Sequence, residues 1–173
     1  VYTQVIYNDE ELVLFRTGVG PEAAKISMNI TVDKFAKPKK MIFSGIAGGL
    51  DPSLSSGQTV VVTNWHPLEN YNEVVAVDAE LLKLIKPSYI TANGVTSDHF
   101  VSNGNEVYAL TQATIVDMET YYIAKIASEN GIPFIAFRSV SDMANGTKDK
   151  SKFQIAADNS ARAAIEFIST LTP

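Results

Sequence analysis

Residues 138–146, RSVSDMANG, place an arginine, two serines and a carboxylate directly after the apolar run IPFIAF. Such a run has the composition of a buried strand. Asp142, with Ser141 beside it, would therefore be partly desolvated at the end of the strand, and desolvation favours the neutral acid, which can donate a proton. The stretch predicts a general acid at Asp142; a helix cap or an ion pair with Arg138 is the alternative.

A second cluster, VDMETYYIA at 116–124, places two carboxylates and a methionine where a strand meets a helix. The helix dipole favours acidic residues in a first helical turn, and this effect alone would account for Asp117. Glu119 could instead point into a pocket, where an ionised carboxylate can accept hydrogen bonds from two adjacent sugar hydroxyls. Met118 would then form a soft, adaptable wall of that pocket.

Two glycine-rich segments offer further binding chemistry. GVGPEA at 18–23 fits the G-x-G-x-x-A pattern of dinucleotide sites, which would indicate NAD, but the next strand ends in Ser44-Gly45 and not in the acidic residue that holds a ribose. A tight turn with close helix–strand packing, or helix-start amides that face an anion or a sugar hydroxyl, are the other interpretations. SGIAGG at 44–49 predicts a ligand-facing loop, with a plain connector as the alternative.

The elements that must position these residues follow from apolar periodicity and from glycine and proline punctuation. The pattern predicts strands at 11–18, 40–45, 57–65, 87–95, 113–117 and 133–140, and helices at 20–35, 118–129 and 153–171. Strand–helix–strand occurs twice with nearly all-apolar strands, which predicts an α/β fold whose sheet is buried on both faces and is at least partly parallel. In such folds ligands bind beyond the carboxyl ends of the strands, where the polar and glycine residues cluster here.

Composition narrows the possible functions. The 173 residues are 46% hydrophobic and 19% charged, which suits one compact domain. A net charge of −5 argues against a surface that binds duplex nucleic acid. Cysteine is absent, and His66 and His99 lack the spacing of a metal site. No apolar stretch approaches the roughly 18 residues that span a bilayer. We therefore expect a cytoplasmic protein without a metal, another cofactor, a nucleic acid or a membrane as partner.

Several motifs together resemble the purine nucleoside phosphorylase and nucleosidase superfamily, most closely its 5′-methylthioadenosine/S-adenosylhomocysteine nucleosidases. The motifs run in family order over most of the chain: TGVGPEAA, SGIAGGLDPSLSSGQTVVV, TSDHFV, VDMETYYIAKIASENGIPFIAFRSVSDMANG and the alanine-rich final helix. The resemblance implies a three-layer α/β fold with a central mixed sheet flanked by helices over residues 1–173, usually dimeric. It also implies cleavage of the N-glycosidic bond of a purine nucleoside, with adenine as the base.

The resemblance assigns roles to the matching positions. Asp142 would protonate N7 of the leaving adenine, and Ser141 would help to hold that carboxyl group. Glu119 and Met118 would grip the ribose, Phe100 would stack on the base, and the Val101 backbone would read its edge. Two more residues of these motifs complete the predicted substrate site: Gly48 and Arg138.

Some positions depart from the family pattern. Phosphorylases of the superfamily carry an arginine just before the glycine loop, whereas Phe43 and Ser44 stand here, which favours water over phosphate as nucleophile. The family opens with a strand and a water-activating glutamate, and that segment would lie before Val1. Ile46 replaces a serine or threonine, and PLENYNEVVAVD at 67–78 replaces a longer segment. These changes leave open a phosphorylase, another nucleosidase such as one for futalosine, or a non-catalytic nucleoside-binding relative.

Overall fold

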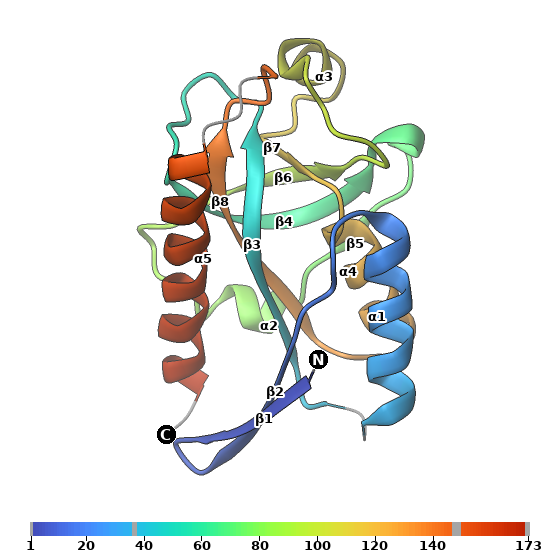
Figure 1. Ribbon diagram of the computed structural model, residues 1–173, viewed down its shortest axis with the longest axis vertical. Coiled ribbons are helices and arrows are strands. Elements are labelled where there is room, and N and C mark those ends of the chain that lie inside the picture. The colour runs from blue at the N-terminus through green and yellow to red at the C-terminus, as the bar shows by residue number, and fades with distance from the viewer. Residues whose placement is uncertain (1, 36–37, 147–149, 172–173) are drawn as a thin grey trace.

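The computed structural model describes residues 2–35, 38–146 and 150–171 (Figure 1). Its strands are β1 (Tyr2–Tyr7), β2 (Glu10–Phe15), β3 (Met41–Gly49), β4 (Thr59–Pro67), β5 (Val75–Ala76), β6 (Ile90–Thr96), β7 (Ile115–Asp117) and β8 (Phe134–Asp142). Its helices are α1 (Pro21–Lys34), α2 (Ala79–Leu82), α3 (Gly104–Thr111), α4 (Thr120–Glu129) and α5 (Lys150–Leu171), with a 3₁₀ turn at Leu68–Asn70.

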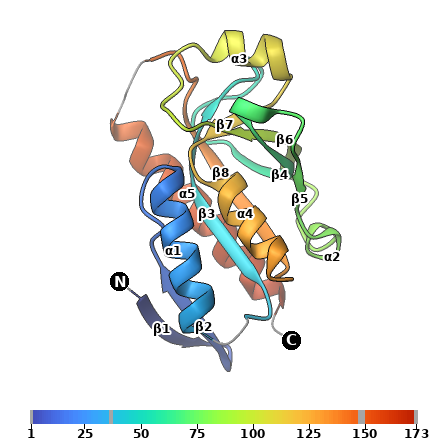
Figure 2. The same cartoon turned by 90° about the vertical axis from the view of Figure 1, so that its right-hand side faces the viewer.

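The central sheet is mixed and has the strand order β5-β4-β6-β7-β3-β8. Strand β3 runs parallel to β8 and antiparallel to β7, while β4, β6 and β7 are parallel in turn. Strand β8, at the end of this order, also pairs antiparallel with β4, which links the two ends of the sheet. Helix α5 packs against β3 and β8, whereas α1 and α4 lie together on the other side (Figures 1 and 2). The predicted α/β class, with a mixed sheet flanked by helices, is confirmed.

The hydrophobic core fills both sides of this sheet. The larger part lies against α1 and α4 and contains Met28, Trp65 and Ile123, all fully buried. The second part lies under α5, where Phe137 meets Phe167. All residues of β8 before Asp142 are buried, as expected for a strand covered on both faces. The core therefore fixes the strand that carries Arg138, Ser141 and Asp142.

The segment 44–49 differs from the prediction, because it is not a loop. Strand β3 continues through Gly49, and its pairing with β8 extends from Met41 opposite Phe134 to Gly48 opposite Asp142, with one irregularity after Ala47. Glycine can take part in strand pairing, and its lack of a side chain lets neighbouring residues approach the backbone of β3 closely. An added Cβ at Gly48 would lie 3.0 Å from the Cβ of Ala144.

The first predicted strand also behaves differently, since β2 does not join the central sheet. It pairs along its whole length with β1, through a turn at Asn8 and Asp9 whose φ angles are 49° and 62°. Two positive φ angles are typical of a tight two-residue hairpin turn. Strand β3 pairs with β7 only at Gly48 and Gly49, so within the described chain one edge of residues 41–47 has no strand partner.

Replacing Phe137 by alanine tests the core beneath α5. The ring is fully buried, 5.3 Å from the ring of Phe167 and 5.7 Å from that of Tyr89. Phe137→Ala should lower the free energy of unfolding by about 3–5 kcal/mol, measured by chemical denaturation. The control Ile165→Ala, at a side chain of α5 that is 56% exposed, should cost about 0.5 kcal/mol or less. Equal losses in the two variants would contradict this packing.

Candidate functional site

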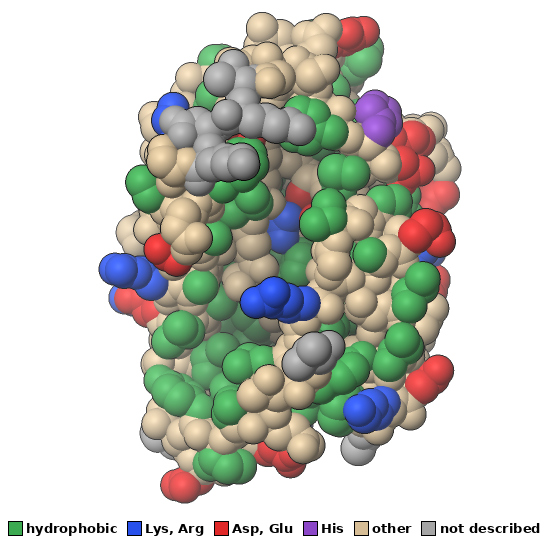
Figure 3. Space-filling view, in the orientation of Figure 1, with side chains coloured by type: hydrophobic (Ala, Val, Ile, Leu, Met, Phe, Trp, Pro, Cys, Tyr) green, Lys and Arg blue, Asp and Glu red, His purple; other side chains and the backbone are tan. Residues whose placement is uncertain are grey.

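A cavity of about 1030 Å³ opens beside the unpaired edge of β3. In Figure 3 it is the hollow at the centre of the visible face, with charged side chains inside and hydrophobic ones around its lower part. Residues from β2, β3, β7, β8, α5 and the loop before α3 line it. The structure brings all eight sequence-predicted site residues to this cavity: Gly48, Phe100, Val101, Met118, Glu119, Arg138, Ser141 and Asp142. Their individual roles stay predictions.

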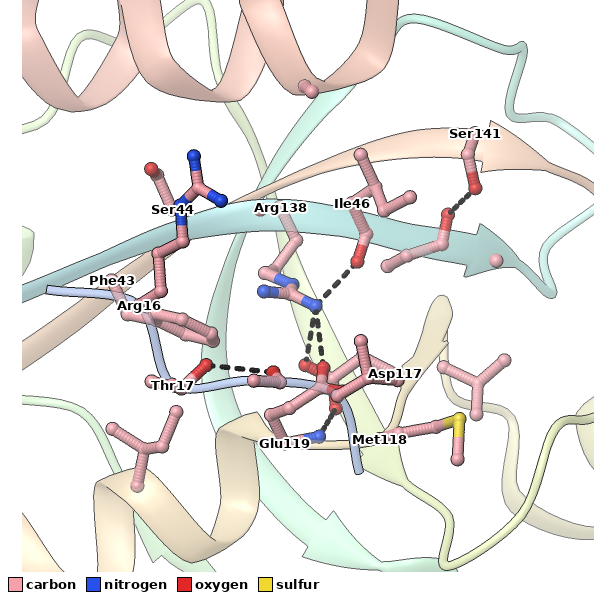
Figure 4. Close-up of a pocket in the computed structure, with 18 of the residues that line it drawn as sticks. Arg16, Thr17, Phe43, Ser44, Ile46, Asp117, Met118, Glu119, Arg138 and Ser141 are labelled. Carbon is pink, nitrogen blue, oxygen red and sulfur yellow. Dashed lines mark hydrogen bonds and ion pairs between the residues drawn. The ribbon is translucent and has the colours of Figure 1, made fainter. Parts of the chain in front are cut away.

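The guanidinium group of Arg138 lies at the centre of the site and is almost completely buried. Its Nη2 atom is 3.1 Å from Asp117 Oδ2 and 3.3 Å from Glu119 Oε2, and it donates a hydrogen bond to the carbonyl of Ile46 (Figure 4). The ring of Phe43 lies 4.7 Å from the guanidinium carbon. The alternative that Arg138 pairs with Asp142 is therefore wrong.

Glu119 is held between this guanidinium and the start of α1. Its Oε1 accepts a hydrogen bond of 2.8 Å from the amide of Gly20. Burial raises the pKa of Glu119, and the nearby charge of Asp117 raises it further, against the opposing effect of Arg138. Two carboxylates thus share one guanidinium, which leaves a net negative charge when both are ionised.

Asp117 is only 6% exposed and does more than interact with the dipole of the helix that follows it. Its Oδ1 accepts a 2.6 Å hydrogen bond from the hydroxyl of Thr96, and Oδ2 accepts from the amide and hydroxyl of Thr120. Asp117 therefore anchors Arg138 in the sheet and is not merely a helix-start residue. The apolar strand directly before it was the available signal, because a carboxylate buried there requires a cationic partner.

The GVGPEA segment forms a tight turn with close packing, one of the interpretations of its pattern. Gly18 and Gly20 have φ angles of 85° and 87°, and an added Cβ at Gly18 would lie 2.8 Å from the Cβ of Ala23. Only glycine adopts such a backbone readily. The helix-start amide of Gly20 does face an anion, and that anion is Glu119 of the same chain.

Asp142 lies half-buried at the other end of the cavity. Ser141 Oγ donates to Asp142 Oδ2 at 2.8 Å, and the amide of Ala144 donates to Oδ1 at 2.9 Å. The bond two residues ahead is that of an Asx turn, so Asp142 shapes the turn after β8 and does not cap a helix. Val101 packs with Ala144, which places the loop of Phe100 and Val101 at this same end.

Arg16, Thr17 and Ser44 also line the cavity, although the sequence analysis did not select Arg16. Arg16 follows β2 directly and extends toward Ser44 (Figure 4). In the described part of the chain its guanidinium has no hydrogen-bond or ion-pair partner. The polar run RTG after the apolar strand was the signal that could have indicated it.

The described residues contain no group of three His, Asp or Glu side chains placed to hold a metal ion. None of the helices in the described chain is long and apolar enough to cross a bilayer.

The family model of the phosphorylase superfamily matches residues 1–169. The 5′-methylthioadenosine/S-adenosylhomocysteine nucleosidase of Staphylococcus haemolyticus is 31% identical in an alignment that covers 83% of this chain and 74% of that protein. The enzyme of the same name from Staphylococcus epidermidis is 31% identical over 95% of this chain and 82% of its own length. The chain therefore belongs to the phosphorylase superfamily and, within it, to the 5′-methylthioadenosine/S-adenosylhomocysteine nucleosidase family.

Solved structures of the same family share this fold. The S-adenosylhomocysteine nucleosidase of Streptococcus pyogenes, in complex with 5-methylthiotubericidin, superposes with a TM-score of 0.88 at 24% identity, over 98% of this chain and 84% of that one. The 5′-methylthioadenosine/S-adenosylhomocysteine nucleosidase of Colwellia psychrerythraea, in complex with adenine, also gives 0.88, at 20% identity over 98% and 82% of the two chains. At these identities the likeness shows the fold.

Replacing Gly45 by alanine tests how tightly Arg138 is enclosed. An added Cβ would lie 2.4 Å from Arg138 Nη1 and 3.1 Å from Cζ, so the buried guanidinium would have to move. Gly45→Ala should cost about 1–3 kcal/mol of unfolding free energy. The control Ser44→Ala, one residue earlier in β3, should change it by about 0.5 kcal/mol or less. If both variants are as stable as the parent chain, Arg138 is not confined as described.

Proposed function

We propose that this chain hydrolyses the N-glycosidic bond of an adenine nucleoside of the 5′-methylthioadenosine/S-adenosylhomocysteine type and releases adenine. The observation that carries the proposal is one cavity that contains Asp142 at one end and the buried Arg138–Glu119 pair beside it. A leaving base needs a proton donor, and a sugar that becomes cationic needs nearby negative charge. The two staphylococcal relatives are 5′-methylthioadenosine/S-adenosylhomocysteine nucleosidases by name, which supports the same substrate class.

Asp142 is the proposed general acid at N7 of the base. Because the amide of Ala144 holds Oδ1, the carboxyl proton belongs on Oδ2, the atom beside Ser141. Ser141 has one hydroxyl proton and two acceptors in reach, Asp142 Oδ2 and the carbonyl of Ala47 at 3.2 Å. It can donate to Ala47 while Asp142 is neutral and to Asp142 once the proton has left. Such proton transfer is typically worth about 10²–10⁴ in rate.

Glu119 is the proposed ribose ligand. When ionised it can accept hydrogen bonds from the two ribose hydroxyls, with Met118 as the adjacent wall. Two carboxylates around one guanidinium favour an oxocarbenium-like sugar electrostatically. The remaining proposed contacts are to the base: Phe100 by stacking, the Val101 backbone at the base edge, and Gly48 by leaving room.

Water is the proposed nucleophile. The position where phosphorylases carry a phosphate-binding arginine holds Phe43, whose ring packs against the guanidinium of Arg138. The family resemblance assigns activation of that water to a glutamate ahead of Val1. A single domain over residues 1–173, a homodimer and a cytoplasmic location also stay predictions, as does a purine nucleoside being the partner in place of nucleic acid or membrane.

Asp142→Asn tests the general acid. In the full-length protein it should lower kcat for adenine release from 5′-methylthioadenosine by about 100-fold or more, because the amide has no acidic proton to give. The dissociation constant, measured by calorimetry, should change little. The control Asp98→Asn alters a carboxylate that binds the Tyr122 hydroxyl outside the cavity, and should keep the parent rate. Undiminished release by Asp142→Asn, or release that requires phosphate, would contradict the proposal.

The raised pKa of Glu119 predicts how nucleoside binding depends on pH. Its ordinary value is 4.5, and with the pKa raised Glu119 takes up a proton at a higher pH and then loses an acceptor for ribose. In an Asp142→Asn background the dissociation constant for 5′-methylthioadenosine should therefore rise as the pH falls through that raised pKa. Adding Asp117→Asn removes a charge that raises the pKa, so this change should move to lower pH. A pH profile that Asp117→Asn does not move would exclude Glu119 as the titrating ligand.

A further inference from the structure

We propose that Glu69 is a positioning residue for the adenine base, because its carboxylate holds the loop that carries Phe100 and Val101. The inference rests on the proposed function and goes further, since it assigns a role to a side chain that lies outside the lining of the cavity. Glu69 touches no reacting atom and acts through the loop alone. Three observations support this role: where two strands end, which groups one carboxylate oxygen binds, and how the loop is buried.

The ends of β4 and β6 place Glu69 beside this loop. The two strands are parallel neighbours and stay paired to their last residues, with Pro67 opposite Thr96 (Figure 1). The chain leaves β4 into the 3₁₀ turn that contains Glu69, and it leaves β6 into the loop at 97–103. Both segments therefore begin at the same edge of the sheet, the edge at which ligands bind in such folds.

One carboxylate oxygen of Glu69 faces three consecutive residues of the loop. Its Oε1 atom accepts a hydrogen bond of 3.0 Å from the backbone amide of Asp98 and one of 3.3 Å from the hydroxyl of Ser97. The Nδ1 atom of His99 lies 3.6 Å from the same oxygen. Hydrogen bonds to an ionised acceptor are about twice as strong as those between neutral groups. Glu69 therefore fixes the backbone directly ahead of Phe100.

The burial of the loop explains why this contact matters. Ser97 is fully buried and its amide donates a 2.8 Å hydrogen bond to a carbonyl of β7, while Val101 is 9% exposed. Between these two ends, residues 98–100 are exposed, and Phe100 is 43% exposed. Burial holds an exposed stretch only weakly, so the course of its backbone decides where the aromatic ring lies. The hydrogen bonds of Glu69 set that course two residues before the ring.

Glu73 provides a matched control from the same turn region. Its side chain is 46% exposed, compared with 39% for Glu69. Its carboxylate accepts a hydrogen bond from the hydroxyl of Tyr121, pairs with Lys125 at 3.4 Å, and accepts from the amide of Asn70. Glu73 thus carries the same charge at a similar exposure but binds helix α4 and its own turn.

Binding of free adenine to the full-length protein, measured by calorimetry, tests the inference. Glu69→Ala should raise the dissociation constant about 5- to 10-fold, because it removes charge-assisted hydrogen bonds that hold the loop. Glu69→Gln keeps an acceptor oxygen without the charge and should raise it less. Glu73→Ala should leave it unchanged.

Kinetics and a second background separate positioning of the base from a general loss of structure. For 5′-methylthioadenosine, Glu69→Ala should raise KM by a similar factor and change kcat by less than about 2-fold, because the loop grips the base equally before and during cleavage. In a Phe100→Ala background, Glu69→Ala should add less than about 2-fold to the dissociation constant for adenine, since the two residues act through one contact.

An adenine dissociation constant that Glu69→Ala does not alter, or that Glu73→Ala raises equally, overturns the inference. A full effect of Glu69→Ala in the Phe100→Ala background also overturns it. Adenine binding requires no turnover, so the two proposals can fail separately. If Glu69→Ala weakens adenine binding as expected while the parent protein cleaves no nucleoside, the inference stands and the proposed function fails. If the folded parent protein binds no adenine, the inference falls as well.

Discussion

The site depends on one buried positive charge, the guanidinium of Arg138. Removing a charge from water is costly, and the cost is recovered only when the charge is paired and its hydrogen bonds are satisfied. Asp117, Glu119 and the carbonyl of Ile46 provide partners for Nη2. Among the described residues the buried Nε atom of Arg138 has no hydrogen-bond partner. The partners of Nη2 belong to segments distant in sequence, so the ion pairs connect β3, β8 and the β7–α4 junction around the cavity. The same requirement explains Gly45, where a Cβ would collide with Arg138, and Gly20, whose amide completes the environment of Glu119.

This arrangement divides the cavity by charge. Near Arg138 two carboxylates exceed the single guanidinium, which suits a sugar that becomes cationic as its bond to the base breaks. At one end Asp142 faces the cavity with one oxygen held by an amide and the other beside a serine hydroxyl. At the opposite end Arg16 supplies positive charge among apolar side chains. The proposed positions of the base, at Asp142, and of the sugar, at Glu119, therefore differ in their electrostatic environment.

Much of this was predictable from the sequence, for identifiable reasons. Strands buried on both faces, such as β8, appear as unbroken apolar runs, and the polar residues that follow them gather at one edge of the sheet. Single-sequence patterns fail where pairing decides the structure. The amino-acid sequence of β2 does not indicate that it pairs with β1 and stays outside the central sheet. The segment SGIAGG resembles a loop because glycine lowers strand propensity, yet β8 pairs with it from Ser44 to Gly48. Helix α2 and strand β5 are too short to show any period. The pairing of Arg138 with Asp117 and not with Asp142 is likewise a result of tertiary geometry.

The most direct test of the central claim is an experimental structure of the Asp142→Asn protein with an intact 5′-thioether adenine nucleoside bound. The account predicts N7 within hydrogen-bond distance of residue 142, about 2.7–3.2 Å, and both ribose hydroxyls on Glu119. A nucleoside bound with its base away from residue 142 and its sugar away from Glu119 would contradict it.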